Sequence, residues 1–206
     1  MTDKPMQNST EKGVQGFTLV ELLIAMAITL VVIGSLASTF ISQRKTYNVQ
    51  EQITEMQQTA RAAMDMISRE VKMAGYDPDF PRIFGTVSGI FGIPYSATQL
   101  AIRADLNEDG DTSDTHENIT YTYDSTDKQI DRNTGGGAQA FAENIQSFTF
   151  QYYDIDGNTT TTDADIRQIE ITITARTSKP DPDYGQNSGY RTYKLISYVT
   201  PPNLDL

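Results

Sequence analysis

The chain has 206 residues, a formal net charge of −11 and no cysteine, so we expect one ordinary domain with an appended segment. The negative charge argues against nucleic-acid binding through broad neutralisation of phosphates and against tight docking on an anionic lipid leaflet. The lack of cysteine excludes disulfides and thiolate chemistry, and a single histidine excludes a zinc site built from several histidines of one chain.

Residues 1–16 form a short polar leader, and an apolar run follows it. A secretory signal peptide has the opposite order, because its apolar stretch precedes the cleavage site. Cleavage after Gly16 therefore leaves the apolar segment on the mature protein. Across this junction the sequence reads Gly-Phe-Thr-Leu-Val-Glu, from Gly16 to Glu21.

The junction resembles the prepilin peptidase site of type IV pilins and of type II secretion pseudopilins. The resemblance implies cleavage between Gly16 and Phe17 by a prepilin peptidase and methylation of the new N-terminal amine of Phe17. It also implies an assembly role for Glu21, whose carboxylate would pair with the N-terminal amine of a neighbouring subunit. The position of Glu21 alone equally allows an interfacial acid that reaches the lipid headgroups.

Residues 22–41 carry no formal charge. As a helix with 1.5 Å per residue, this segment would span roughly 30 Å, the thickness of a bilayer core. Together with the junction it predicts a transmembrane and assembly helix over residues 17–41. Basic residues flank the segment on both sides and do not orient it. The resemblance implies a single-pass bacterial inner-membrane protein with its head in the periplasm, which later moves to a cell-surface pilus.

The helical pattern continues over residues 42–75, where apolar residues recur at steps of three and four. This spacing is typical of an amphipathic helix with one buried face. The recurring residues are Val49, Ile53, Met56, Ala60, Met64, Ile67, Val71 and Ala74. Gly75, followed by Tyr-Asp-Pro, indicates the end of the helix.

Residues 61–78 sharpen the resemblance, because their sequence is similar to the end of the long helix in PilW-like minor pilins. Those proteins help to prime the pilus and lie near its tip. The J-type minor pseudopilin of type II secretion is a close relative of them. The implied partners are other pilins and minor pilins through the N-terminal helix, the prepilin peptidase, and the inner membrane before assembly.

Residues 76–206 predict a β-rich head outside the cytoplasm. Short segments rich in β-branched and aromatic residues alternate with turn-rich stretches there. The predicted strands are 99–103, 118–123, 146–153, 166–175 and 190–199. With the long helix they predict an α+β pilin fold, in which the N-terminal helix packs on an antiparallel β-sheet.

The acidic loop, residues 105–117, reads DLNEDGDTSDTHE and contains six carboxylates without a lysine or arginine. Asp105, Asn107 and Asp109 occupy alternate positions, and Gly110 follows. This order resembles the first half of an EF-hand calcium loop, where oxygen ligands surround the ion and glycine permits a sharp turn. Calcium is therefore the cofactor that we expect here.

The second half of the acidic loop departs from the EF-hand pattern. His116 holds the position of the closing glutamate, and Glu117 follows one residue late. Asp114 or Glu117 would close a longer loop, and the Asp111 carbonyl would contribute to it. The hypothesis is a calcium site formed by Asp105, Asn107, Asp109, Asp111, Asp114 and Glu117. The alternative is a solvated acidic turn.

Two further features of the head have plainer interpretations. Residues 154–158, with the sequence DIDGN, lie between two predicted strands, so a hairpin turn is favoured, and Asp163 and Asp165 leave a second metal site open. His116 lies near acidic residues, but the sequence contains no nucleophile elbow, catalytic carboxylate pair or glycine-rich cofactor motif. We predict no catalytic residue and no enzyme activity.

The sequence predicts a minor type IV pilin that takes part in pilus assembly or priming at or near the pilus tip. A minor pseudopilin of a type II secretion system is the first alternative, because it shares the same N-terminal chemistry. A tip adhesin that binds a surface is the second. A single-pass membrane receptor is the third, and it differs from the others in keeping its leader.

Overall fold

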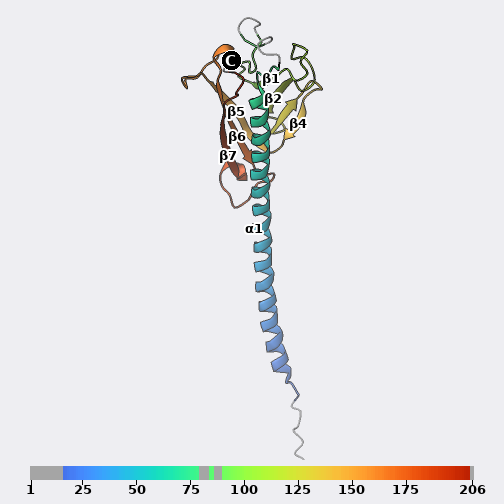
Figure 1. The fold of residues 1–206 in the computed structure, drawn as a ribbon. Coiled ribbons are helices and arrows are strands. Elements are labelled where there is room, and N and C mark those ends of the chain that lie inside the picture. Colours follow the sequence, from blue (N-terminus) through green and yellow to red (C-terminus); the bar gives the residue numbers. More distant parts are fainter. Residues whose placement is uncertain (1–15, 79–83, 86–89, 205–206) are drawn as a thin grey trace, which may run out of the picture. The chain divides into compact units, whose positions relative to one another are not determined.

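The computed structural model describes residues 16–78, 84–85 and 90–204, which divide into two compact units between Asn48 and Val49. One helix, α1, runs from Leu19 to Met73 and contributes to both units (Figure 1). The predicted helix over residues 17–75 thus begins two residues later and ends two residues earlier than expected.

In the first unit, the side chains of α1 point outward and the apolar ones are exposed. Hydroxyl groups in this apolar part bond to the backbone of their own helix. Thr29 Oγ1 donates to the carbonyl oxygen of Ala25 at 2.7 Å, and Ser35 Oγ donates to that of Val31 at 2.9 Å. These bonds satisfy the hydroxyls without outside partners, as an apolar environment requires.

In the second unit, the remaining part of α1 buries one face. The predicted stripe is confirmed for its six C-terminal members, whereas Val49 and Ile53 are only half-buried. The buried members of the stripe are Met56, Ala60, Met64, Ile67, Val71 and Ala74. A spacing of three and four residues places these side chains on one side of the helix, so a single stripe carries the packing.

The end of α1 depends on Gly75, which has a left-handed φ of +74°. Its nitrogen donates to the carbonyl oxygen of Arg103 at 2.8 Å, which ties the end of the helix to the first strand. Gly92 approaches the same point so closely that a methyl group on it would lie 2.3 Å from the Gly75 nitrogen. Glycine therefore serves both the helix end and this close contact.

Four strands form an antiparallel meander in the order β1-β2-β3-β4. Their bounds are β1 Gln99–Arg103, β2 Asn118–Asp124, β3 Gln129–Asn133 and β4 Gln139–Ala142. The sequence predicted β1 and β2 but not β3 or β4. In β3 only Ile130 is apolar, so no alternating pattern was visible to mark the strand.

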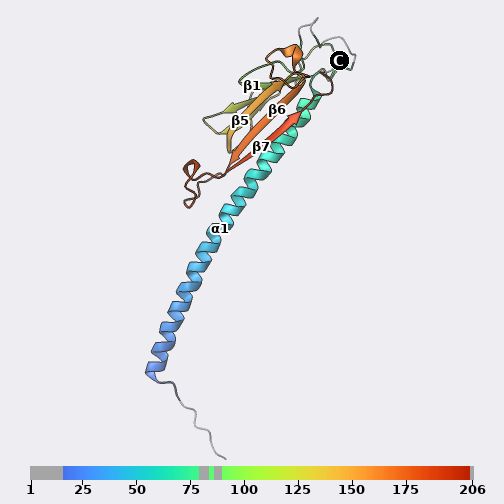
Figure 2. The same cartoon turned by 90° about the vertical axis from the view of Figure 1, so that its left-hand side faces the viewer.

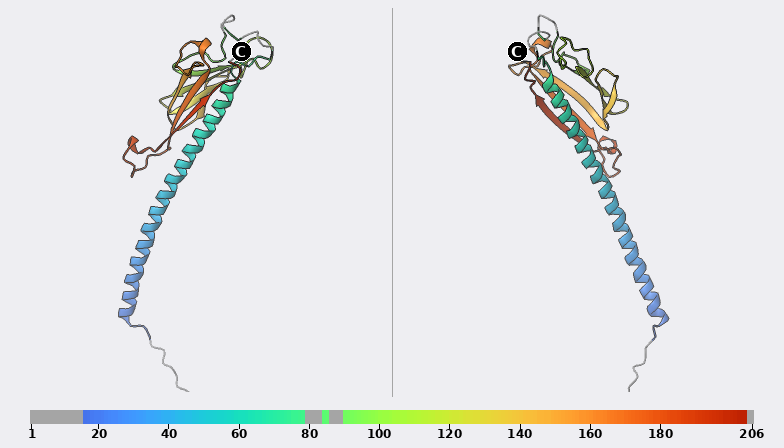
Figure 3. Two further views of the ribbon diagram at one scale, coloured as in Figure 1. Left: turned by 60° about the vertical axis from the view of Figure 1, so that its left-hand side comes forward. Right: turned by 45° about the vertical axis from the view of Figure 1, so that its right-hand side comes forward.

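Three longer strands form a second antiparallel sheet in the order β5-β6-β7 (Figures 2 and 3). They are β5 Ile145–Tyr153, β6 Gln168–Arg176 and β7 Thr192–Val199. Short 3₁₀ turns, Asp163–Asp165 and Asn187–Gly189, lie in the two connections. All three strands were predicted, with bounds correct to within two residues.

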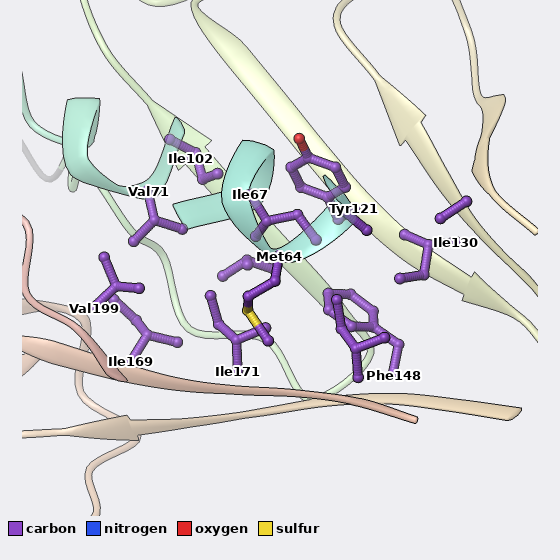
Figure 4. Packing of buried hydrophobic residues seen from close by; sticks show 14 of the residues in the cluster. Met64, Ile67, Val71, Ile102, Tyr121, Ile130, Phe148, Ile169, Ile171 and Val199 are labelled. Carbon is purple, nitrogen blue, oxygen red and sulfur yellow. The ribbon is translucent and has the colours of Figure 1, made fainter. Parts of the chain in front are cut away.

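The core of the second unit lies where α1 meets both sheets (Figure 4). Met64, Ile67 and Val71 point from the helix into this core. Ile102, Tyr121 and Ile130 face them from the four-stranded sheet, and Phe148, Ile169, Ile171 and Val199 from the three-stranded sheet. The α+β class, with a long N-terminal helix packed on antiparallel structure, is therefore confirmed, and the single expected sheet is divided into two.

One ionic cluster is embedded beside this core. Glu70 is 7% exposed, and its Oε1 accepts a hydrogen bond from Nη2 of Arg132 at 2.6 Å. Its Oε2 accepts one from the hydroxyl of Tyr121 at 2.5 Å. Burial, reinforced by the Glu70 carboxylate, raises the pKa of Tyr121, so this hydroxyl keeps its proton and acts as a donor. The cluster joins α1 to β2 and β3.

Candidate functional site

The first turn of α1 contains Thr18 and Glu21 in a reciprocal pair of hydrogen bonds. The Thr18 backbone nitrogen donates to Glu21 Oε2 at 3.0 Å, and the Glu21 nitrogen donates to Thr18 Oγ1 at 3.2 Å. The Thr18 hydroxyl also donates to Glu21 Oε2, at 3.1 Å. This is a capping box, which satisfies backbone donors at the start of a helix.

The capping box gives Glu21 a role that the sequence interpretation overlooked. The spacing of threonine and glutamate three residues apart is itself the signal for such a box, and it was visible in the sequence. The carboxylate therefore has partners within its own chain. Its predicted pairing with the amine of a neighbouring subunit stays a prediction.

The predicted cleavage site lies immediately before the helix. Phe17 exposes 91% of its surface, and Gly16 is exposed as well. A methyl group on Gly16 would meet no heavy atom of the described residues within 4 Å. The described residues therefore leave the bond between Gly16 and Phe17 sterically accessible.

The helix that follows contains a segment long and apolar enough to cross a membrane, judged by length and composition. None of the residues of this segment is buried within the chain. An exposed apolar surface of this extent marks a site that lipid or other protein covers. The N-terminal site thus combines an accessible cleavage junction, a capped carboxylate and an uncovered apolar helix.

The acidic loop connects β1 to β2, and Asp105 lies at its base. Asp105 is 1% exposed, with Oδ1 accepting from the nitrogen of Glu108 at 2.8 Å and Oδ2 from that of Gly110 at 3.1 Å. Its own nitrogen donates to the carbonyl oxygen of Tyr76 at 2.8 Å. Asp105 therefore organises the backbone of the loop and attaches it to the chain just after α1.

Glu117 closes the other end of the acidic loop and is 2% exposed. Its Oε1 accepts hydrogen bonds from the nitrogens of Leu106 at 2.8 Å and Asn107 at 3.2 Å. Its Oε2 is buried, and within the described part of the chain it has no hydrogen-bond partner. A buried oxygen of a carboxylate without a donor is costly, so this atom requires an explanation.

The structure brings three of the six predicted ligands together. Carboxylate oxygens of Asp109, Asp111 and Glu117 lie within 4.8 Å of one another. Asn107 Nδ2 donates to Asp109 Oδ2 at 3.1 Å and to Asp114 Oδ2 at 2.7 Å, and its Oδ1 accepts from the nitrogen of Asp109 at 3.1 Å. Asp114 is therefore held by the amide of Asn107, outside the trio.

The charge state of Asp111 follows from its surroundings. Hydrogen bonds from the backbone nitrogen and the hydroxyl of Ser113 lower the pKa of Asp111 below its ordinary value. Asp109 also accepts from a backbone nitrogen, that of Asp111, at 3.1 Å. Asp111 is thus ionised at neutral pH, and carboxylates this close repel one another unless a cation lies between them.

The acidic loop has one residue more than an EF-hand loop before its closing glutamate. The backbone accommodates this residue at His116, whose φ is +77°. Its nitrogen donates to the carbonyl oxygen of Thr134 at 3.1 Å, and the Glu117 nitrogen donates to that of Asp114 at 3.1 Å. This turn directs the late glutamate back into the loop. His116 itself is exposed, and its part in the loop is conformational.

The second acidic segment, residues 154–158, forms the predicted turn. Asp154 Oδ1 accepts from the nitrogens of Asp156 at 3.0 Å and Asn158 at 2.8 Å. The turn belongs to a longer connection between β5 and β6 that also contains Asp163. Asp163 Oδ1 accepts from the nitrogen of Tyr95 at 2.8 Å. Among the described residues, these aspartates form no cluster of three or more possible ligands.

Comparison with known proteins gives two family matches. The model described as "Prepilin peptidase-dependent protein B" matches residues 49–193, more than half of the chain. The model described as "Prokaryotic N-terminal methylation motif" matches residues 12–37, which include Gly16, Phe17 and Glu21. No curated protein matches the chain.

Among solved structures, a type IV-like pilin from Thermus thermophilus is similar to this chain at 10% sequence identity, with a TM-score of 0.43. The similarity covers 71% of this chain and 97% of that one. The two family matches confirm a type IV pilin-like protein that depends on prepilin peptidase. The chain belongs to the prepilin peptidase-dependent protein B family.

Proposed function

We propose that this protein is a minor type IV pilin that takes part in pilus assembly or priming, at or near the pilus tip. The main support is the coincidence of the methylation motif over residues 12–37 with an apolar helical segment that its own chain leaves uncovered. A position near the tip is supported by the similarity of residues 61–78 to PilW-like minor pilins.

The apolar segment explains how such a subunit changes its environment. In the inner membrane, lipid covers residues 22–41, and in a pilus the helices of neighbouring subunits would cover them instead. Exchange of lipid for helix contacts supplies little hydrophobic driving force, because both surroundings are apolar. Assembly therefore needs energy from the pilus machinery and a specific contact that sets the register.

We assign to Glu21 the contact that sets the register between neighbouring subunits. A carboxylate in a membrane helix costs about 2.5–3.5 kcal/mol at its centre and less near an end. The capping box lowers this cost within one subunit, because Thr18 donates to the carboxylate twice. After cleavage, the amine of Phe17 on a neighbouring subunit would add a charged partner, so subunits in the correct register are favoured.

In this role the chain acts by binding and catalyses no reaction. Its partners are the prepilin peptidase, the inner membrane before assembly, and then other pilins and minor pilins. The head would face the periplasm and later the cell exterior. A minor pseudopilin of a type II secretion system is the second candidate, because the methylation motif and the apolar helix serve both machines equally.

The test is deletion of the gene, with pili counted by electron microscopy and the deletion complemented from a plasmid. We expect pili to be lost and to return with the wild-type chain. Unchanged pili with a loss of secreted proteins would instead support the pseudopilin. Unchanged pili with unchanged secretion would contradict both proposals.

Two variants separate the charge of Glu21 from its capping role. Glu21→Gln keeps an acceptor at the third helical position, where glutamine also forms capping boxes, but removes the charge. Thr18→Ala removes the hydroxyl's part of the cap and keeps the charge. If Glu21 sets register through charge, the first variant fails to restore pili and the second restores them. Restoration by Glu21→Gln with failure of Thr18→Ala would instead show that the cap, and not the charge, is required.

A further inference from the structure

We propose that the acidic loop is a calcium site in which Asp109, Asp111 and Glu117 supply carboxylate ligands. The site is argued from the geometry of residues 105–117, and only its expected affinity and use rest on the proposed location of the head outside the cell. The geometry also narrows the ligand set expected from the sequence, since the other three residues have structural tasks within the loop.

The spacing of the trio suits one calcium ion. Calcium binds oxygen at 2.3–2.6 Å, so two ligands on opposite sides of the ion lie about 5 Å apart. The ligand oxygens of Asp109, Asp111 and Glu117 all lie within 4.8 Å of one another. One ion between them would therefore lie close to its bonding distance from all three oxygens.

The buried oxygen of Glu117 supplies a second and separate argument. In a solvated acidic turn, water would surround the carboxylates. Glu117 belongs to the trio, yet its side chain is buried, with 2% exposed. Its Oε1 has two backbone donors, and its Oε2 has no hydrogen-bond partner among the described residues. A bound cation would provide that partner and offset the cost of burying the charge.

The remaining acidic and amide groups hold the trio in place. Asp105 bonds to two nitrogens of the loop backbone, at Glu108 and Gly110, and both residues have left-handed φ angles. Asn107 bridges Asp109 and Asp114 through its amide group. A loop with so many internal bonds loses little conformational freedom when it binds an ion.

The chemistry of the trio favours calcium over other divalent ions. All three ligands are hard carboxylate oxygens, which suit calcium, magnesium and manganese better than zinc. Magnesium demands near-ideal octahedral geometry at about 2.0–2.1 Å, whereas calcium accepts irregular oxygen cages. By analogy with extracellular modules, we expect a dissociation constant of about 10⁻⁴ to 10⁻³ M.

A bound ion would strengthen one junction of the second unit. The base of the acidic loop bonds through Asp105 to the carbonyl of Tyr76, and Gly75 bonds to the end of β1 at Arg103. Calcium would thus couple the β1–β2 connection to the chain that leaves α1. A head exposed outside the cell meets enough calcium to use such a clamp.

The test uses the full chain in detergent, freed of divalent ions with a chelator and titrated with calcium chloride by calorimetry. We expect one ion per chain and a weaker response to magnesium chloride. At a calcium concentration of one hundred times the dissociation constant, the Tm should rise by about 5–10 °C. Absence of binding up to about ten times the upper end of the expected range would overturn the proposal.

Matched variants locate the site. Asp109→Asn removes one charge from the trio, and we expect calcium binding at least tenfold weaker. Glu117→Gln should abolish the calcium-dependent rise in Tm and leave the chelated protein at least as stable, because an uncompensated buried charge is removed. Asp156→Asn, in the similar turn at residues 154–158, is the control and should bind as the wild type does. Equal weakening in all three variants, or in none, would contradict this location.

Discussion

The two parts of α1 have the same backbone geometry and opposite surroundings. In the first unit its apolar side chains are exposed, and Thr29 and Ser35 bond back to their own helix. In the second unit its apolar side chains are buried against two sheets, and the polar Glu70 depends on Arg132 and Tyr121. The described part of the chain leaves the first part exposed, whereas it buries one face of the second.

This difference predicts where substitutions act. A change in the second part removes contacts that the folded chain makes with itself, so it lowers the free energy of unfolding. A change of an apolar side chain in the first part removes no packing contact of this kind, so its effect should appear in membrane insertion or assembly.

The largest effect is expected for Glu70→Ala. This variant leaves the guanidinium of Arg132 and the hydroxyl of Tyr121 without their buried partner. Removal of one member of a buried ion pair costs about 3–5 kcal/mol. Urea denaturation of the full chain in detergent, followed by tyrosine fluorescence, measures the loss. The double variant Glu70→Leu with Arg132→Met should recover part of it, because no charge then remains unpaired.

The next effect compares two isoleucines of the same helix. Ile67 is fully buried, and Ile67→Ala should lower the free energy of unfolding by about 2–5 kcal/mol through lost burial and a cavity. Ile28 is 59% exposed in the first part, and Ile28→Ala should leave the unfolding of the head unchanged. The same denaturation experiment measures both variants. A similar loss in the two would contradict the division of α1.

Much of this division was predictable, because it follows from periodicity. An uninterrupted apolar run marked residues 22–41, and steps of three and four marked the stripe that ends at Ala74. The stripe could not reveal that Glu70 is buried, because a charged residue beside a buried helix face is ordinarily exposed. Its partners, moreover, come from β2 and β3, which are distant in the sequence. The polar sequence of β3 also concealed that strand, and only its pairing with β2 shows why it forms.

The acidic loop was predictable in composition and not in geometry. The alternation of Asp105, Asn107 and Asp109 indicated oxygen ligands around a cation. Sequence spacing could not decide whether Asp114 or Glu117 faces the loop centre. That choice depends on the left-handed backbone at His116, which only the folded loop displays.

A smaller effect is expected at the end of α1, where the helix meets β1. Gly75→Ala places a side chain at a φ of +74° and brings its methyl group to 3.0 Å from the carbonyl oxygen of Asn203. The left-handed conformation alone costs an ordinary residue about 1–2 kcal/mol. Thermal denaturation should show a correspondingly lower Tm. As a control, Gly34→Ala lies in the first part, where a methyl group meets no described heavy atom within 4 Å, and should not lower the Tm.

The smallest effect concerns the exposed turn between β2 and β3, where Asp124 Oδ1 accepts from the nitrogens of Thr126 at 2.7 Å and Asp127 at 3.2 Å. These donors, Asp127 first, lower the pKa of Asp124 in the folded chain. A carboxyl whose folded pKa lies below its unfolded value adds stability above the unfolded pKa of about 3.9. That contribution is lost as the pH falls through the folded pKa.

Asp124→Asn should therefore give a slightly lower Tm than the wild type at pH 7. The difference should disappear as the pH falls below the folded pKa of Asp124, where the carboxyl is neutral in both the folded and the unfolded chain. Asp65→Asn, on an exposed part of α1, is the control and should show no comparable change. A Tm difference that persists unchanged at low pH would show that the turn depends on the shape of the side chain and not on its charge. The turn would then be held by uncharged hydrogen bonding. The hydroxyls of Thr29 and Ser35 in the first part are satisfied in the same way, by carbonyl oxygens and without any charge.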